Sequence, residues 1–186
     1  MATIKRIGFG QVEPNHLSAQ RNGQTYASLP CRRKFDEDGK LTEDSITVLE
    51  NGQFAKYDYA KNEVNFTGAG EWMLVMNEVK VYDDKQSYRH FALQSKNYDG
   101  GVITPRLLKT MPGDIFTTNT FGGNNTDGDA KMENISVPNV EGLLYVGADG
   151  FLTGTQPESY DGPVFQVVNI YTMPDGQDGV KVMRIK

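Results

Sequence analysis

Short runs in which apolar and polar residues alternate make up much of the chain, and turn-forming pairs separate them. Alternation with a period of two is typical of a strand that buries one face. Turn signals this frequent leave room for many strands and for little helix. The pattern predicts an all-β fold, either an antiparallel β-barrel or a β-sandwich, with an extended N-terminal arm. The turn pairs are Asn51-Gly52, Asp99-Gly100, Pro112-Gly113, Asp127-Gly128, Asp149-Gly150, Asp161-Gly162, Asp175-Gly176 and Asp178-Gly179.

Residues 111–114, near the middle of the chain, have the sequence Met-Pro-Gly-Asp, which favours a type II turn. Pro112 presets a φ of about −65° at the second position of the turn, and Gly113 accepts the positive φ of the third. Residues 106–110 precede the turn without a helical stripe of apolar positions. The segment after it, residues 115–121, is rich in β-branched and aromatic residues. We predict that these two segments form a β-hairpin.

A second hairpin is predicted closer to the N-terminus. Residues 45–49 and 53–59 flank Asn51-Gly52, a pair typical of the type I′ turn that joins hairpin strands. Residues 71–76 form the most apolar stretch of the chain. We interpret that stretch as a buried central strand.

Further strands are predicted from short apolar runs bounded by turn residues. Residues 63–67 alternate between polar and apolar side chains and form one such strand. In the last third of the chain, residues 142–146 pair with 151–153 in one predicted hairpin, and residues 164–172 pair with 180–185 in another. Both faces of residues 164–172 are mainly apolar, so we expect this strand to be covered on both sides.

The N-terminal segment, residues 1–35, has poor periodicity because glycine, proline and asparagine interrupt its few apolar positions. We interpret it as an extended arm that packs on other protein chains, since termini are ordered mainly when something holds them. Residues 36–186 form the predicted β-domain. A division of this domain into two small subdomains near residue 100 is an open alternative.

Composition and charge narrow the classes of function. The chain has 186 residues, 38% of them hydrophobic and 23% charged, which is a globular composition with a length suited to one domain or two small ones. Its 24 acidic residues exceed its 19 basic ones and give a net charge of −5. Broad nucleic-acid binding requires an excess of positive charge, so we expect no nucleic-acid partner.

The cysteine content and the hydropathy pattern indicate where the protein is made. The single cysteine, Cys31, excludes an intrachain disulfide and agrees with folding in a reducing cytoplasm. No apolar run approaches the roughly 20 residues that a membrane-spanning helix needs. The first residues also lack the apolar segment of a signal peptide. We expect a soluble protein made in the cytoplasm, without a membrane partner.

The sequence contains no enzyme or cofactor motif. HExxH, GxSxG, P-loop, CxxC and Rossmann glycine patterns are absent from it. A zinc site would have to use mainly carboxylates, because Cys31, His16 and His90 are the only cysteine and histidines. The neighbouring acids Asp83 and Asp84 would point to opposite faces of a strand, so they cannot flank one glycosidic bond. We predict no enzyme activity and no catalytic, cofactor-binding or metal-binding residue.

Two further patterns have a functional and a structural interpretation. In the glycine- and asparagine-rich segment 122–134, an EF-hand alignment puts Gly123 at the first ligand position and Asn134 at the twelfth. Neither residue supplies the carboxylate that calcium requires there, so a surface loop is favoured. The basic residues 32–34 resemble a phosphate-binding patch. Acids at 36–38 follow at once, which favours a charge-balanced, solvated turn.

The order of these segments resembles that of small virion proteins of tailed bacteriophages. The resemblance spans about residues 45–186 and is carried by LENGQFAKYDYAKNEV, EWMLVMNEVKVYD, RHFAL, TPRLLKTMPGDIFTTNTF and the terminal FQVVNIYTMPDGQDGVKVMRI. Proteins of this type are encoded in the head module beside the major capsid protein. They act as decoration, cement or minor capsid proteins, or as bases for head fibres.

The resemblance implies a structural protein that decorates or cements a phage capsid. Its expected partners are the major capsid protein and other virion proteins, with self-association in the assembly, and its expected location is the capsid surface. A tail or connector protein of the same β-class is one alternative. A carbohydrate-binding β-module is another, with exposed tyrosines and Trp72 as sugar platforms. The apolar residues that follow Trp72 favour a place in the core for that side chain.

Overall fold

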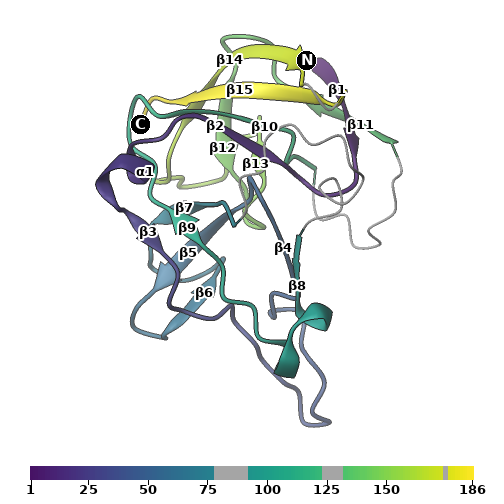
Figure 1. The fold of residues 1–186 in the computed structure, drawn as a ribbon, viewed down its shortest axis with the longest axis vertical. Helices are drawn as coiled ribbons and strands as arrows, with labels where there is room; N and C mark the ends of the chain where they lie inside the picture. The colour runs from purple at the N-terminus through teal and green to yellow at the C-terminus, as the bar shows by residue number, and fades with distance from the viewer. Residues whose placement is uncertain (78–91, 123–131, 174–175) are drawn as a thin grey trace.

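The computed structural model describes residues 1–77, 92–122, 132–173 and 176–186, and it confirms the all-β prediction. Strands dominate the described chain (Figure 1). Helical structure within these ranges consists of the one-turn helix α1 (Ser18–Asn22) and two short 3₁₀ turns, η1 (Ser95–Asn97) and η2 (Asp99–Gly101).

The strands of the described residues form two larger sheets and two ribbons, and the named strands pair antiparallel throughout. The six-stranded sheet has the order β13 (Leu152–Thr153), β12 (Leu143–Val146), β14 (Phe165–Thr172), β15 (Asp178–Arg184), β10 (Ile115–Thr118), β2 (Val12–His16). The five-stranded sheet has the order β3 (Thr25–Tyr26), β9 (Leu107–Leu108), β7 (Trp72–Val75), β5 (Phe54–Asp58), β6 (Glu63–Asn65). The ribbons pair β1 (Ala2–Ile7) with β11 (Met132–Val137) and β4 (Val48–Glu50) with β8 (Ala92–Gln94).

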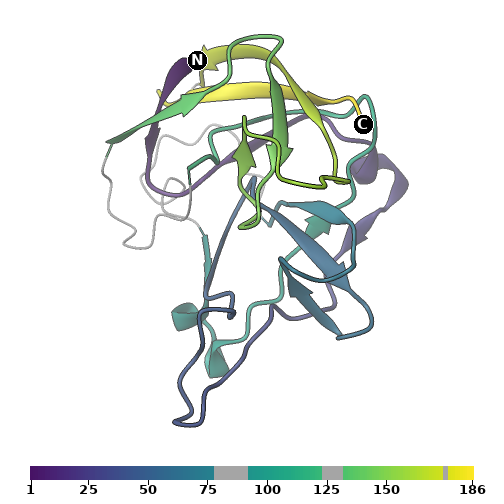
Figure 2. The same ribbon diagram turned by 180° about the vertical axis from the view of Figure 1, so that it is seen from behind.

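The five-stranded sheet lies in the middle of the molecule and buries both of its faces (Figures 1 and 2). Successive residues of a strand point to opposite faces. Along β7, Trp72 and Leu74 therefore enter one apolar core, while Met73 and Val75 enter another. All four residues of β7 are buried and β7 lies between β9 and β5, which confirms the predicted central strand.

We call the core that contains Trp72 and Leu74 the upper core. It fills the space between the two larger sheets, as in a β-sandwich. The rings of Phe54, Phe116 and Phe165 meet there with centroids 5.3, 5.6 and 6.3 Å apart. The lower core lies on the opposite face of the five-stranded sheet and includes Leu49 and Ile103. The boundary between the two cores thus runs through this sheet and not near residue 100 of the chain.

The N-terminal segment is extended, as predicted, but residues 2–19 belong to the core of the domain and do not form a separate arm. β1 pairs with β11 along its whole length, and β2 pairs with β10. Ile4, Phe9 and Val12 are buried between these elements. The sequence favours an arm because glycines, Gly10 among them, interrupt its few apolar positions. Gly10 instead permits a close approach, since a β-carbon there would lie 2.1 Å from Oγ1 of Thr120.

The turn at residues 111–114 forms as predicted, but the hairpin around it does not. The amide of Asp114 donates to the carbonyl of Met111 over 3.0 Å, and Gly113 has a φ of 92°. The flanking strands β9 and β10 belong to different sheets. The turn is therefore a corner between the two layers. The buried carboxylate of Asp114 fixes it by accepting hydrogen bonds from the amides of Met111 and Ser18, at 2.8 and 2.9 Å.

The predicted hairpin at Asn51-Gly52 is wrong for a similar reason. Gly52 has a φ of 86°, but Asn51 is not among the residues with positive φ, so the turn is not of type I′. β4 pairs with β8, and β5 pairs with β6 and β7.

The two predicted hairpins in the last third of the chain are confirmed as β12–β13 and β14–β15. β14 is less covered than expected, because Val168 and Asn169 are exposed on its outer face. Asp83, Asp84, His90 and most of the glycine- and asparagine-rich segment lie outside the described residues.

Deletion of residues 1–17 is expected to prevent folding. It removes the buried side chains of Ile4, Phe9, Val12 and Leu17. A fully buried apolar side chain contributes about 1.5–3 kcal/mol, so four of them approach the roughly 5–15 kcal/mol total stability of a typical domain. Circular dichroism and thermal melting measure the result. Deletion of Met1 alone, which is 77% exposed, is the control. A truncated protein with a wild-type melting transition would contradict this placement of the N-terminus.

Substitution of Gly113 is expected to destabilise the protein through the backbone alone. No atom lies within 4 Å of the position of an added β-carbon, so no steric clash contributes. Gly113→Val should lower the free energy of unfolding by about 1–3 kcal/mol because a β-branched residue is strained at positive φ. Gly113→Asn is the matched variant and should lose less, since asparagine tolerates this conformation. Urea unfolding measures both, and equal losses would refute the backbone explanation.

Candidate functional site

A large open groove lies between the β1–β11 ribbon and the β12–β13 hairpin. Its volume is about 920 Å³. Met1, Ile135 and Pro138 line one side, and Leu143 and Tyr145 line the other. The remaining lining residues are Phe121, Gly122, Ser136, Gly147, Ala148, Asp149, Phe151, Leu152, Thr153, Gly154 and Thr155. The strands that bound the groove lie in the upper half of the molecule and can be followed in Figure 2.

The β12–β13 wall is positioned by direct contacts with the five-stranded sheet. The amide of Phe54 donates to the carbonyl of Gly150 over 2.8 Å, and Nε2 of Gln53 donates to the carbonyl of Asp149 over 2.7 Å. Gly150 has a φ of 82°, and a β-carbon there would lie only 2.0 Å from the carbonyl oxygen of Phe54. The glycine is therefore required for the hairpin turn to reach the central sheet.

The opposite wall is positioned by strand pairing in the N-terminal ribbon. Ile4 pairs with Ile135 and Ala2 with Val137. Pro138 then ends β11 and contacts the other wall, since a β-carbon on Gly154 would lie 2.8 Å from its ring. Both walls are thus parts of the folded β-structure.

The chemistry of the groove favours apolar side chains over charged ligands. Asp149 is the one acidic side chain among the described residues that line the groove, and its Oδ1 accepts a hydrogen bond from the amide of Phe151 over 3.2 Å. At the rim, Met1 is 77% exposed and Leu143 is 40% exposed. Val140, in the connection between β11 and β12, is 50% exposed. Exposed apolar surface that surrounds a hollow is typical of a protein-binding site.

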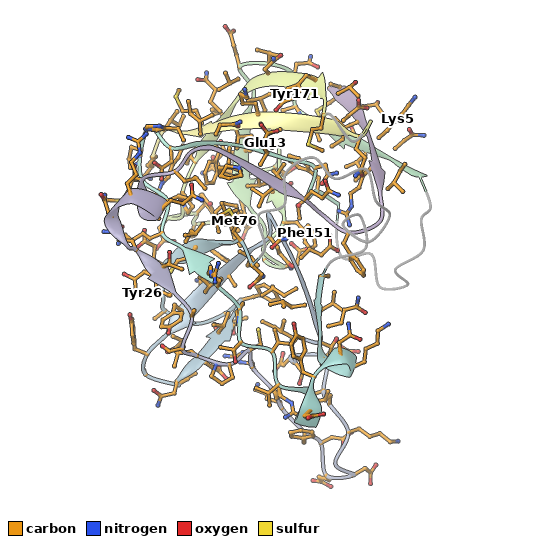
Figure 3. The ribbon with its side chains drawn as sticks, in the orientation of Figure 1. Lys5, Glu13, Tyr26, Met76, Phe151 and Tyr171 are labelled. Atoms are coloured by element: carbon orange, nitrogen blue, oxygen red, sulfur yellow. The ribbon has the colours of Figure 1, made fainter. Side chains whose placement is uncertain are left out.

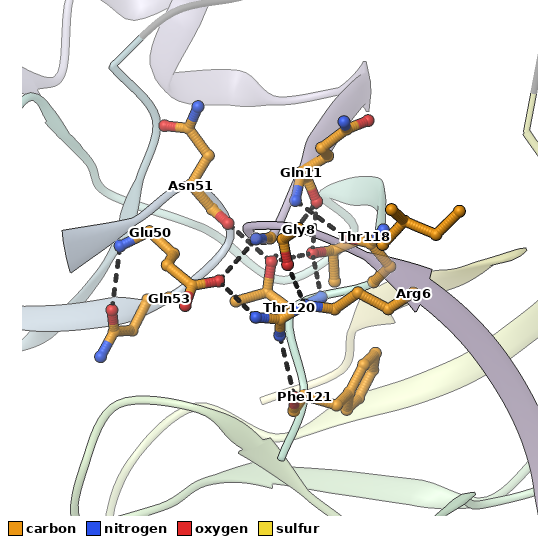
Figure 4. Close-up of polar contacts among 12 residues, drawn as sticks. Arg6, Gly8, Gln11, Glu50, Asn51, Gln53, Thr118, Thr120 and Phe121 are labelled. Carbon is orange, nitrogen blue, oxygen red and sulfur yellow. Dashed lines mark hydrogen bonds and ion pairs between the residues drawn. The ribbon is translucent and has the colours of Figure 1, made fainter. Parts of the chain in front are cut away.

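A buried polar cluster joins β1, β4, the segment between β1 and β2 and the segment after β10, and Figure 4 shows it. Nη2 of Arg6 lies 2.8 Å from Oε2 of Glu50, and the two side chains are 1% and 0% exposed. Arg6 also donates to the carbonyls of Gly8 and Phe121 at 3.1 and 3.0 Å. Glu50 accepts the amide of Gly10 over 2.5 Å. This cluster is paired and closed to solvent, which indicates a structural role.

Two threonines extend the same cluster: Thr118 at the end of β10 and Thr120 just after it. Oγ1 of Thr118 donates to the carbonyl of Gln11 over 2.7 Å, and Oγ1 of Thr120 donates to the carbonyl of Asn51 over 2.6 Å (Figure 4). These bonds connect the N-terminal segment and the β4–β5 turn to β10. The cluster therefore fixes how the layers are joined.

The predicted aromatic platforms differ in their exposure. Trp72 is only 9% exposed, and Nζ of Lys56 lies 4.9 Å from its ring centroid, so the indole is part of the core. Tyr59 is 66% exposed and meets the buried ring of Tyr57 edge-on, with centroids 5.0 Å apart. Tyr59 is the strongest candidate for a sugar contact among the aromatic residues that the structure describes.

Two of the basic residues 32–34 pair with acids, but not with the acids at 36–38 that follow them in the sequence. Arg32 is buried, and not solvated as predicted, and it forms an ion pair with Glu63 at 2.7 Å. Lys34 forms one with Asp44 at 2.5 Å.

The remaining reactive side chains form no centre in the described part of the chain. Burial raises the pKa of the Cys31 thiol well above its ordinary value, so the thiolate needed for reactivity is suppressed. Nδ1 of His16 lies 3.4 Å from Arg21 at the surface. Within the described ranges, no group of three or more His, Cys, Asp or Glu side chains is arranged to hold a metal ion.

No chemical motif marks the groove in the sequence, although most of its lining lies within residues 135–155 and includes the predicted hairpin of residues 142–146 and 151–153. The helices of the described residues include none that is long and apolar enough to cross a membrane.

The chain matches no family model, no curated protein and no solved structure.

Loss of one partner of the Arg6–Glu50 pair is expected to destabilise the fold strongly. Arg6→Met removes the guanidinium that pairs with the buried carboxylate of Glu50, and Glu50→Gln removes the carboxylate that pairs with that guanidinium. Each should cost about 3–5 kcal/mol because a buried charge loses a hydrogen-bonded ion-pair partner. The double variant should cost less than the sum of the two, which urea unfolding in a double-mutant cycle tests. Strictly additive losses would show that the pair is not coupled.

Proposed function

We propose that the protein is a structural virion protein that decorates or cements a tailed-phage capsid by binding the major capsid protein. The observation that carries the proposal is the open apolar groove between β11 and the β12–β13 hairpin. A groove of about 920 Å³ accepts several side chains of a partner segment. The exposed Met1, Val140 and Leu143 beside it add apolar contact area.

The rigid attachment of the groove walls to the rest of the domain also supports a capsid-binding role. Both walls of the groove are held by hydrogen bonds and strand pairing to the rest of the domain. A preformed site loses little conformational freedom on binding, so more of its contact energy contributes to attachment. The resemblance of the segment order to small head-module proteins suggests the identity of the partner, the major capsid protein. The virion surface is the location that this proposal implies.

Two alternative functions compete with the capsid-binding proposal. The same groove suits a tail or connector protein that binds neighbouring tail chains. A carbohydrate-binding module is favoured by one observation, the 66% exposure of the Tyr59 ring. Exposed tyrosine rings provide flat apolar faces with a polar edge.

The purified protein is expected to co-sediment with preassembled, expanded shells of the major capsid protein and to raise their resistance to heat. Leu143→Asp, which introduces a charge at the groove, should weaken this binding by at least about tenfold, since a charge buried without a partner is costly. Ile185→Asp is the matched control. It changes an aliphatic residue that is 45% exposed, against 40% for Leu143, but lies outside the groove.

Two results would contradict the head assignment. Co-sedimentation only with tail fractions of disrupted virions would favour the tail or connector alternative. Binding to a glycan array that is lost in Tyr59→Ser, without binding to shells, would favour the carbohydrate-binding module.

A further inference from the structure

A second set of exposed apolar side chains lies at the other end of the long axis. We call residues 34–44 the tip loop; it protrudes at the lower end of the molecule in Figure 1. Phe35 and Leu41 face each other across this loop in an antiparallel bridge and are 53% and 37% exposed. Tyr98 and Val102, on the neighbouring 3₁₀ segment, are 42% and 40% exposed. The side chains of this end are drawn in Figure 3.

Arg33 links the tip loop to the 3₁₀ segment. Its guanidinium carbon lies 4.9 Å from the centroid of the Phe35 ring. A β-carbon on Gly101 would lie 3.6 Å from Nη2 of the same arginine. The amide of Gly101 in turn donates to the carbonyl of Tyr98 over 2.9 Å. The exposed apolar residues therefore belong to one surface.

Hydrogen bonds hold the tip loop in a defined shape. The amide of Thr42 donates to the carbonyl of Lys34, and the amide of Asp36 to the carbonyl of Lys40, each over 2.8 Å. Oδ1 of Asp36 accepts the amides of Asp38 and Lys40 at 3.0 and 2.8 Å. The exposed Phe35 is thus presented on a preformed loop, which reduces the entropy that binding would cost.

The tip loop also carries a strong negative charge. Two lysines against five acidic residues leave a net charge of −3 within its 11 residues. Lys34 is engaged by Asp44, and its hydrogen bond and positive charge lower the pKa of that carboxyl. The five acids are Asp36, Glu37, Asp38, Glu43 and Asp44.

We propose that the tip loop is a second attachment site, which inserts Phe35 and Leu41 into an apolar pocket bordered by lysine or arginine on a neighbouring capsid protein subunit. The apolar pair requires a pocket, and the acids around it require positive charge at the rim of that pocket. A second copy of the tip is disfavoured as the partner, because two loops of charge −3 repel each other. The identity of the partner rests on the proposed function.

Two attachment sites at separate ends make the protein a bridge. The strands that bound the groove lie in the upper half of the molecule and the tip loop at its lower end (Figures 1 and 2). Contacts that are linked through one folded body strengthen each other, because the first raises the effective concentration of the second. A protein that binds two subunits in this way joins them across the shell.

The test is binding to the same expanded shells at two ionic strengths. Phe35→Ser/Leu41→Ser should weaken binding by at least about tenfold, the effect of losing a central apolar contact. Glu37→Lys/Asp38→Lys should also weaken it and should reduce its dependence on salt, because exposed charges are screened by ions. Thermal melting of each variant should match that of the wild type, since these side chains are exposed.

Two control variants and three outcomes complete the test. Tyr59→Ser removes an exposed ring elsewhere, and Glu158→Lys/Asp161→Lys reverses two exposed acids elsewhere; both should bind as the wild type does. Loss of binding in the tip variants alone supports the proposal. Wild-type binding by the tip variants overturns it and leaves the proposed function intact. A wild-type protein that binds no shell overturns the proposed function and, with it, this inference.

Discussion

The ion pair between Arg6 and Glu50 is the interaction on which the arrangement of the layers depends. The guanidinium of Arg6 and the carboxylate of Glu50 are almost completely buried, so each needs hydrogen-bond partners within the protein. Arg6 comes from β1, Glu50 from β4, and the carbonyl that Arg6 also binds belongs to Phe121, after β10. Moving any of these segments away would remove a hydrogen bond from a buried charge, which is costly. The pair therefore favours this packing of the strands over arrangements that break it.

The five-stranded sheet connects the part of the molecule around this ion pair to both apolar cores. Since both its faces are buried, it connects the upper core and the lower core through the same strands. Its strand β5 also holds the β12–β13 turn through Phe54 and Gly150. The groove and the tip loop, although far apart, are thus both built on one central layer. A body of this kind keeps two binding surfaces in a fixed relation.

Local features of the fold were predictable from the sequence, while the pairing of distant segments was not. Residues 72–75 are apolar on both faces, and such a strand has to lie inside a domain. Gly113 and Gly52 were identified as turn residues because the chain there needs positive φ. Their flanking strands were assigned to hairpins, the shortest solution, but each turn in fact connects different sheets. Nothing near residues 1–16 in the sequence indicates that their partners are β11 and β10.

The candidate site was unpredictable for a different reason. Its walls combine Met1, residues around Ile135 and the hairpin at residues 143–155, none of which carries a chemical signature. The hairpin itself was predicted, but its position beside β11 and the pairing of β1 with β11, which adds Met1 to the lining, depend on tertiary packing. The charge of the tip loop, in contrast, was visible in the sequence. Its presentation on a preformed loop beside Tyr98 and Val102 was not.

The pairing of β1 with β11 also determines when the chain can fold during synthesis. Ala2 pairs with Val137, and Arg6 binds a carbonyl 115 positions further along the chain. Strand β1 is thus synthesised long before its partner β11. Contacts this distant in sequence slow folding, and until they form, Ile4 and Phe9 remain exposed to other chains. The nascent chain therefore keeps these apolar side chains uncovered until β11 has been made.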